Sequence, residues 1–284
     1  MKKCLFLSAL WVCLLLTSTG FAVKNVATEL SPVVGYRQDS VKWNTKSGDS
    51  GQWKNLKFIE YGGKGKTTLK DAYVINYDIT LANLVNGNFH DNHYLNPLQT
   101  SNTSAEKFSS LAFRPNLGVG YKFKLAKYFN IIPQIGFVYD LLYIKTKTSN
   151  TGPISAFKNT IQWYGPWFGF DTTTKLAQRW TMNLSAAYQI AFYNGSGNWE
   201  IPPSQGQNTM NQSGTTGHGI TGRFRLQYEV VKSVSLGGEA DIAWKTVKNG
   251  NDSRSFADGT SIKSILSKVT SSSFGARAVL TKAF

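Results

Sequence analysis

The sequence lacks most of the features from which a helical membrane protein or a common enzyme class is recognised. Its two cysteines, Cys4 and Cys13, both lie near the N-terminus, so the rest of the chain has no disulfide and no thiol nucleophile. After residue 22 no run of about 18 apolar residues occurs, which excludes a transmembrane helix there. No phosphate-binding loop, nucleophile elbow or HExxH motif is present. The sequence therefore predicts no cofactor and no metal site.

The N-terminal segment has the pattern of a secretory signal peptide. A basic start is followed by an apolar run from Cys4 to Leu16, and Gly20 and Ala22 provide small residues at the −3 and −1 positions. We expect Sec export and cleavage before Val23, which leaves residues 23–284 as one domain after a signal peptide of residues 1–22. The alternative is an uncleaved anchor, but the apolar run is short for spanning a bilayer.

Alternating apolar residues are abundant in the remaining chain. From Phe113 to Phe123, and again from Ile131 to Tyr143, every second residue is apolar and those between are mostly small or polar. This period of two predicts β-strands with one apolar face. Their length suits a tilted membrane-spanning strand of about 9–11 residues. The short connector Leu125-Ala126-Lys127 would join the two strands as a hairpin.

The same pattern recurs along the chain and predicts ten strands. They cover approximately residues 31–44, 53–61, 69–82, 113–123, 131–143, 159–174, 182–193, 220–228, 234–245 and 274–284. The fold class is therefore all-β, a ten-stranded antiparallel up-and-down transmembrane barrel with short periplasmic turns and longer extracellular loops. Residues 62–66 would form one short turn, and residues 83–107, 194–217 and 248–260 would form outer loops. A soluble β-sandwich is the alternative, but it does not explain apolar faces of this length.

The face of the strands that would point inward carries many charged residues. A narrow ten-stranded barrel is largely filled by its side chains, and buried charges need partners. We expect acids on the third, fifth, sixth and ninth strands to pair with bases on the first, fourth, eighth and tenth. The result would be a salt-bridged plug; a charged pore is the alternative. Inward glycines such as Gly118 and Gly136 would leave room for arginines. The inward charged set is Arg37, Asp78, Arg114, Lys122, Asp140, Asp171, Arg223, Arg225, Glu239, Asp241, Lys245 and Arg277.

The chain is strongly basic, with a formal net charge of +15 at pH 7. Export and the alternating pattern argue against nucleic-acid binding. The excess charge favours contact with an anionic surface, such as the phosphates of lipopolysaccharide. Host surfaces or peptides are further possible ligands of the outer loops. Simple solvation of basic loops explains the charge equally well.

One outer segment carries residues that could support chemistry. Two of the three histidines, His90 and His93, flank Asp91 at the end of the third strand. An Asp–His pair can orient and deprotonate a water molecule for amide hydrolysis, which makes Asp91 and His93 the candidate catalytic residues. A His-x-x-His spacing also occurs at metal sites, but neither signal is specific, and a polar loop without chemistry is the plainer interpretation.

In these segments the chain resembles the omptins, a family of outer-membrane aspartyl-type proteases. The resemblance lies in the ten alternating strands, the Leu56-Lys57-Phe58 segment that leads into the third strand, and the Gly87–Tyr94 segment at its outer end. It implies that Asp91 matches the first acid of the omptin Asp-x-Asp motif, while His93 replaces the second.

The omptin Asp-x-His pair has no counterpart at the outer end of the seventh strand. Residues 193–199 contain neither residue type, and the next histidine is His218. The segment Trp163-Tyr164-Gly165-Pro166-Trp167-Phe168-Gly169 resembles the omptin-like outer-membrane proteins of chlamydia-related bacteria.

These observations predict an integral protein of the bacterial outer membrane. The favoured function is non-enzymatic: a structural or surface-interacting barrel that contacts lipopolysaccharide or a host surface. The first alternative is an omptin-like endopeptidase with a divergent active site, and the second is a narrow channel for small solutes.

Overall fold

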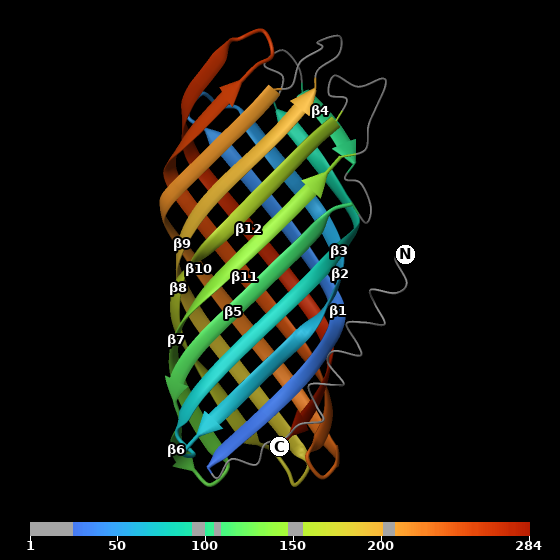
Figure 1. Cartoon of the computed structure of the whole chain (residues 1–284), viewed down its shortest axis with the longest axis vertical. Coiled ribbons are helices and arrows are strands. Elements are labelled where there is room, and N and C mark those ends of the chain that lie inside the picture. Colours follow the sequence, from blue (N-terminus) through green and yellow to red (C-terminus); the bar gives the residue numbers. More distant parts are fainter. Residues whose placement is uncertain (1–24, 93–99, 105–108, 147–155, 201–207) are drawn as a thin grey trace.

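The computed structural model describes residues 25–92, 100–104, 109–146, 156–200 and 208–284. These residues form strands joined by turns (Figure 1). No helix in these ranges is long and apolar enough to cross a membrane. The strands are β1 (Val26–Thr45), β2 (Ser50–Leu69), β3 (Tyr73–Asn92), β4 (Thr100–Ser104), β5 (Leu111–Tyr121), β6 (Phe123–Ala126), β7 (Phe129–Lys145), β8 (Ala156–Lys175), β9 (Trp180–Glu200), β10 (Asn208–Val231), β11 (Val234–Ser255) and β12 (Ser261–Ala283).

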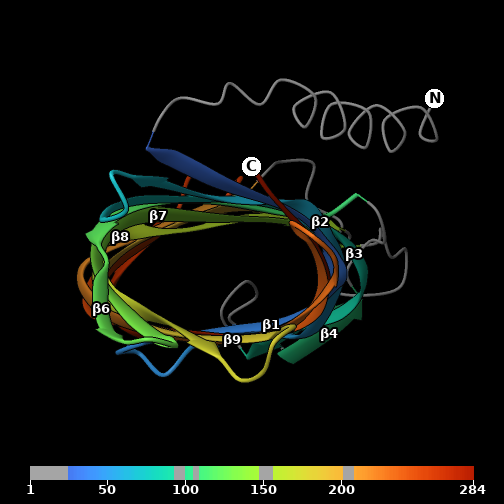
Figure 2. The ribbon, with the colours of Figure 1, turned by 90° about the horizontal axis from the view of Figure 1, so that it is seen from below.

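The sheet closes on itself as an antiparallel barrel. The first strand β1 pairs with both β2 and the last strand β12, where Val34 lies opposite Ala278. The segments β5 and β6 are two parts of one wall strand, interrupted at Lys122, and both pair with β7. The short β4 adds to the outer end of β3. The wall therefore has ten strands, as predicted, and forms a flattened ring when viewed along its axis (Figure 2).

The connections differ between the two ends of the barrel. At one end the strands join through residues 70–72, 127–128, 176–179 and 232–233, and at the other the connections are generally longer. Lys70 and Asp71 have φ of 50° and 59°, the positive values that tight hairpin turns require. The predicted alternation of short and long connections is confirmed. Outer-membrane barrels place the short turns in the periplasm, so the end with the long connections is the outer end.

The turn predicted at residues 62–66 is wrong. This segment lies inside β2, where Lys64 pairs in register with Asp78 of β3. A Cβ on Gly65 would lie 2.0 Å from the ring of Tyr77 on the neighbouring strand. The glycine therefore admits an aromatic ring and does not turn the chain. The turn falls instead at residues 70–72.

The predicted outer loops are also largely wrong, because strand pairing continues through most of them. The strand β3 extends to Asn92, β9 to Glu200 and β11 to Ser255, while β10 begins at Asn208. These outer strand ends are polar because they pass beyond the apolar band, where an outward face needs no hydrophobic side chains. The wall thus rises past the membrane.

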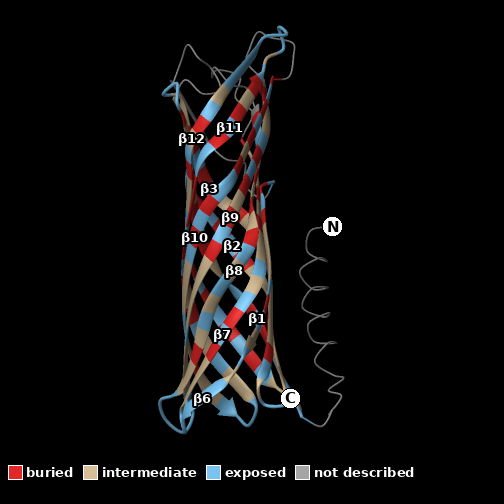
Figure 3. Cartoon of the chain, turned by 90° about the vertical axis from the view of Figure 1, so that its left-hand side faces the viewer, coloured by how far each residue is buried: buried red, intermediate tan, exposed pale blue. Residues whose placement is uncertain are grey.

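The alternation of faces is confirmed along the wall. Outward side chains such as Leu117, Ile135 and Phe168 are more than half exposed, and exposed and buried residues alternate along the strands (Figure 3). In a bilayer these outward apolar side chains contact lipid.

Candidate functional site

Acidic and basic side chains cross the interior of the barrel in a connected set of ion pairs, which we call the ion-pair belt. Seven bases and six acids take part, so the net charge of the belt is close to zero. The basic excess of the chain must therefore lie elsewhere. The members of the belt are Arg37, Asp39, Glu60, Lys64, Asp78, Arg114, Asp140, Arg223, Arg225, Glu239, Asp241, Lys245 and Arg277.

Asp140 on β7 is one centre of the belt. Its carboxylate accepts a hydrogen bond from Lys245 Nζ at 2.8 Å and from Arg114 Nη2 at 3.0 Å. Arg37 Nη2 reaches the other oxygen at 3.3 Å. All of these side chains are largely shielded from solvent. The contacts tie β1, β5 and β11 to β7 across the lumen.

Glu239 on β11 is the second centre. Arg225 Nη2 donates to its Oε2 at 2.6 Å and Arg277 Nη1 to its Oε1 at 3.0 Å, and Lys64 also contacts it. Arg277 in turn contacts Asp241 and Glu60. Because each carboxylate meets several cations, removal of one acid leaves more than one buried charge without full compensation.

The predicted pairing of inward acids with inward bases is confirmed, but its membership needs correction. The sequence pattern missed Asp39, Glu60 and Lys64. Lys64 was assigned to the turn at 62–66, whereas Asp39 and Glu60 lie in the first two predicted strands, whose acids were not assigned to the inward face. Of the predicted members, Asp171 accepts a hydrogen bond from Asn76 at 3.2 Å. Lys122 lies at the break between β5 and β6 and forms none of the belt contacts described here.

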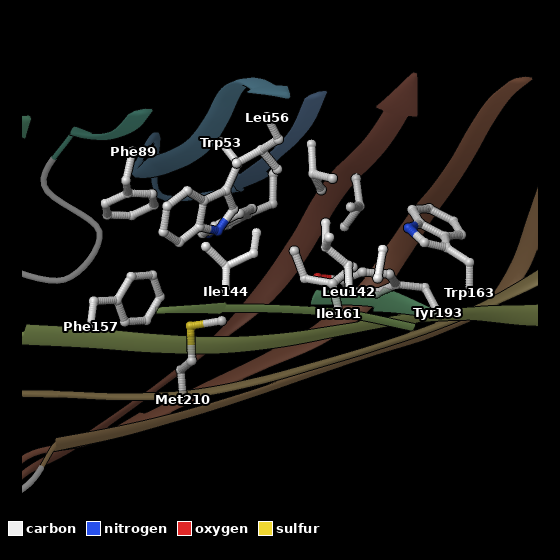
Figure 4. Close-up of a cluster of buried hydrophobic side chains, with 14 of the residues drawn as sticks. Trp53, Leu56, Phe89, Leu142, Ile144, Phe157, Ile161, Trp163, Tyr193 and Met210 are labelled. Atoms are coloured by element: carbon white, nitrogen blue, oxygen red, sulfur yellow. The ribbon is translucent and has the colours of Figure 1, made fainter. Parts of the chain in front are cut away.

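A cluster of buried apolar side chains, which we call the apolar core, lies inside the barrel next to the belt. Trp53 stacks on Phe157 with ring centroids 5.8 Å apart, and Phe89 lies 4.7 Å from Trp53 (Figure 4). Other members come from nearly every wall strand, among them Trp43, Leu56, Phe58, Leu84, Leu142, Ile144, Ile161, Trp163, Tyr193, Trp199, Met210 and Val269. Most of these residues stand toward the outer ends of their strands. The plug therefore has an apolar layer as well as the predicted ionic one.

Two small cavities remain in the lumen on the periplasmic side of the apolar core. Their volumes are about 120 and 100 Å³, and they share Asp78, Asn116, Trp167 and Arg223 as lining residues. Such volumes hold a few water molecules. Both cavities end against the belt.

The ring of Trp167 fills the space above the inward glycines of β5 and β7. A Cβ on Gly118 would lie 2.7 Å from this ring and a Cβ on Gly136 2.5 Å from it. The indole Nε1 donates to Asn116 Oδ1 at 2.7 Å. The expectation that these two glycines make room for arginines is therefore wrong, since they admit a tryptophan.

The candidate catalytic residue Asp91 lies on β3 and not on a loop. It is opposite Gly51 of β2 and is fully buried. The register of β3 against β2 shifts between Phe58 and Lys57 of β2, and Val85 of β3 has no partner there. The buried side chains of β3 are at even-numbered positions up to Leu84 and at odd-numbered positions from Gly87. The shift turns Asp91 to the interior. Its predicted partner His93 lies outside the described residues, so their pairing stays a prediction.

The first histidine after β9 in the sequence faces away from the lumen. His218 on β10 is exposed, and its Nδ1 contacts the hydroxyl of Tyr188 on the outer wall. It therefore lies on the opposite side of the wall from Asp91. The structure does not bring these two residues together.

A second polar network joins strands at the outer end. Arg254 Nη2 contacts Asp49 at 2.9 Å, and Gln212 Nε2 donates to Asp252 at 3.1 Å. At the β11–β12 tip, hydrogen bonds from the hydroxyl and the backbone of Thr260 hold the pKa of Asp258 below its usual value. No cluster of three or more His, Cys, Asp or Glu side chains suited to a metal occurs among the described residues.

The geometry of the wall agrees with that of a solved outer-membrane protein. The chain is similar to the outer-membrane protease OmpT from Escherichia coli, with a TM-score of 0.72 and 13% sequence identity over 94% of this chain and 99% of OmpT. At this identity the match shows the fold alone. A model of the family described as Protochlamydia outer membrane protein matches residues 32–284. The chain belongs to this family.

The Protochlamydia outer membrane protein family accounts for the barrel and places the protein among outer-membrane proteins. Weaker structural likenesses include the translocator domain of the autotransporter NalP from Neisseria meningitidis, with a TM-score of 0.42 at 8% identity over 100% of this chain and 96% of that one. The toluene transporter TodX from P. putida gives 0.33 at 8% identity over 93% and 91%. These scores carry no argument about function. No curated protein matches the sequence.

Proposed function

We propose that this family member is a non-enzymatic outer-membrane barrel that is closed to solutes and presents its outer surface to lipopolysaccharide or to a host surface. The observation that carries the proposal is the pair of layers across the lumen. The charges of the ion-pair belt pair with one another, and the packed aromatic and aliphatic side chains of the apolar core form a second layer. A barrel built in this way is a rigid scaffold, so we expect it to bind other molecules through its outer surface.

We propose that the protein reaches the outer membrane by Sec export with cleavage between Ala22 and Val23. The support is the signal-peptide pattern of the first 22 residues. N-terminal sequencing of protein purified from outer membranes tests this site. A mature chain that begins at Val23 is expected, and one that begins at Met1 contradicts the proposal.

The alternative is an endopeptidase that uses Asp91 and His93. Its support is the fold shared with an outer-membrane protease and the position of Asp91 at the outer end of β3. Purified protein reconstituted with lipopolysaccharide should be incubated with a peptide library. We expect no cleavage. Cleavage that is abolished by Asp91→Asn, while an Asp258→Asn control retains it, would overturn the non-enzymatic function.

A channel for small solutes is the second alternative. It requires a water path through both the belt and the apolar core, and the lumen cavities of about 120 and 100 Å³ lie on the periplasmic side of that core. Conductance across a planar bilayer distinguishes a channel from a closed barrel.

A further inference from the structure

A groove of about 610 Å³ opens on the outer wall of the barrel, across β10, β11 and β12. It faces away from the lumen and shares no residue with the belt or the apolar core. We call it the wall groove. The residues on which the argument rests are Thr216, His218, Trp244, Thr246, Lys248 and Lys268.

The wall groove lies at the outer boundary of the apolar band. Along β11 the outward residues Leu236, Ile242 and Trp244 are exposed and apolar. The next two outward residues are Thr246 and Lys248. A tryptophan at the point where an apolar face becomes polar is typical of the membrane interface. The wall groove is therefore at the level of the lipid headgroups of the outer leaflet.

Two lysines face each other directly across the wall groove. Lys248 of β11 and Lys268 of β12 are partners in the strand register, and both are exposed. Neither forms an ion pair with another residue in the part of the chain that the structure describes. Like charges directly opposite each other destabilise a sheet. An anion bound between the two ammonium groups would remove this repulsion.

Neighbouring groups extend the basic and polar character of the wall groove. Lys42 of β1 is exposed and pairs with Thr270 of β12, two residues along that strand from Lys268. The contact of His218 with Tyr188 holds the imidazole against the wall. Thr246 donates its hydroxyl to the carbonyl of Val269 at 3.1 Å, so this hydroxyl is fixed in the wall and the lysines are the groups that meet an anion.

We infer that the wall groove binds the phosphate group of a phosphorylated lipid of the outer leaflet. Lys248 and Lys268 contact the phosphate, and Trp244 packs beside the upper part of the acyl chains. The site is at headgroup level, which favours a lipid of the same membrane over a soluble polyanion. The inference rests on the proposed surface role and deepens it by naming the site and the class of lipid.

The test measures binding of diphosphorylated lipid A to the purified full-length barrel in phosphatidylcholine nanodiscs, with dephosphorylated lipid A as the comparison ligand. Intact-complex mass spectrometry gives the fraction bound. For Lys248→Ser combined with Lys268→Ser we expect binding about 30-fold weaker, because each lysine near an anionic lipid surface contributes about fivefold. The double substitution to arginine should retain binding.

Two control variants remove the same charge elsewhere. The first is Lys124→Ser with Lys127→Ser, at the periplasmic end. The second is Lys54→Ser with Lys57→Ser, on the outward face of β2. Both should bind like the wild type. All substituted lysines are exposed, and heat-modifiable electrophoretic mobility confirms that each variant is folded.

Specific outcomes would overturn the inference. If the wild type prefers the phosphorylated lipid but the groove variant binds as well as the wild type, the site is wrong and the surface role stands. An equal loss in the Lys54 and Lys57 variant shows diffuse attraction and also refutes the site. If the wild type does not distinguish the two lipids, both the site and the lipopolysaccharide part of the proposed function fail. If the barrel binds a soluble polysulfated polysaccharide in place of lipid A, and this binding depends on Lys248 and Lys268, the ligand of the wall groove is not a lipid.

Discussion

Replacement of Asp140 by asparagine should strongly destabilise the barrel, because this carboxylate is the centre of three ion pairs. Arg37 also contacts Asp39 at 2.6 Å, and Arg114 has Asp241 within 3.9 Å. Lys245 has no second acid among the described ion pairs. The variant therefore leaves one buried ammonium group without a counter-charge. Removal of one member of a buried pair costs about 3–5 kcal/mol.

A second substitution tests whether the loss of stability comes from the unpaired ammonium group of Lys245 or from general disruption of the barrel. Lys245→Met removes the ammonium group and keeps the length of the side chain. Replacement of a buried ion pair by uncharged residues of similar size is often close to neutral, and here Arg37 and Arg114 retain their other acids. We expect the double variant Asp140→Asn/Lys245→Met to lose under about 2 kcal/mol, less than Asp140→Asn alone.

Urea unfolding in phospholipid vesicles, followed by tryptophan fluorescence, gives the free energy of unfolding of each variant. The exposed Asp258→Asn variant is the charge-matched control and should unfold at the wild-type midpoint. If the destabilisation of the double variant equals the sum of the two single variants, Asp140 and Lys245 are not coupled. The belt would then not be the network of mutually compensating charges that the distances indicate.

Two further predictions concern packing inside the barrel, and the same unfolding assay checks them. Gly136→Ala places a Cβ 2.5 Å from the Trp167 ring and 2.2 Å from a backbone carbonyl oxygen, so we expect a loss of about 1–3 kcal/mol. Gly63→Ala, whose Cβ meets nothing within 4 Å, is the control, and equal losses in both variants would refute the packing argument. Trp53→Ala removes a fully buried indole from the apolar core and should cost about 3–5 kcal/mol. A loss below about 1 kcal/mol, within the usual range of a peripheral site, would contradict the role of the apolar core.

The parts of the fold that were predictable from sequence are those that the membrane imposes. Lipid contacts only one face of each strand, so residues such as Leu117 and Ile135 follow a strict period of two. The same period marked Arg114 and Asp140 as inward, and buried charges require partners. Strand number, closure and the principal ion pairs followed from these constraints.

The outer end of the barrel was less predictable because that constraint ends there. Beyond the membrane the outward face is polar, so strands that extend to Asn92 and Ser255 resemble loops in sequence. An irregularity at Val85 of β3, which has no partner in the register with β2, changes the face on which the later side chains of β3 lie. This shift turns Asp91 inward, where the sequence pattern had placed it on an outer loop.

The apolar core was missed for a related reason. Most of its tryptophans and phenylalanines, such as Trp53 and Phe89, alternate with polar outward residues, which reverses the pattern of the lipid-facing part of the wall. On β8 both faces are aromatic, as at Trp163 and Tyr164. Alternation then gives no contrast between the faces. The signal that could have found the core is the presence of large aromatic residues on both faces of β8, which requires an apolar environment on each side of the wall.

The central claim is that the lumen is closed by the ion-pair belt and the apolar core. Single-molecule conductance in a planar lipid bilayer tests it most directly, with a general porin in the same membrane as the positive control. The account predicts no stable conductance steps for the folded wild-type barrel at either polarity of voltage. Reproducible unitary steps from folded protein would contradict it, because ions would then cross both layers.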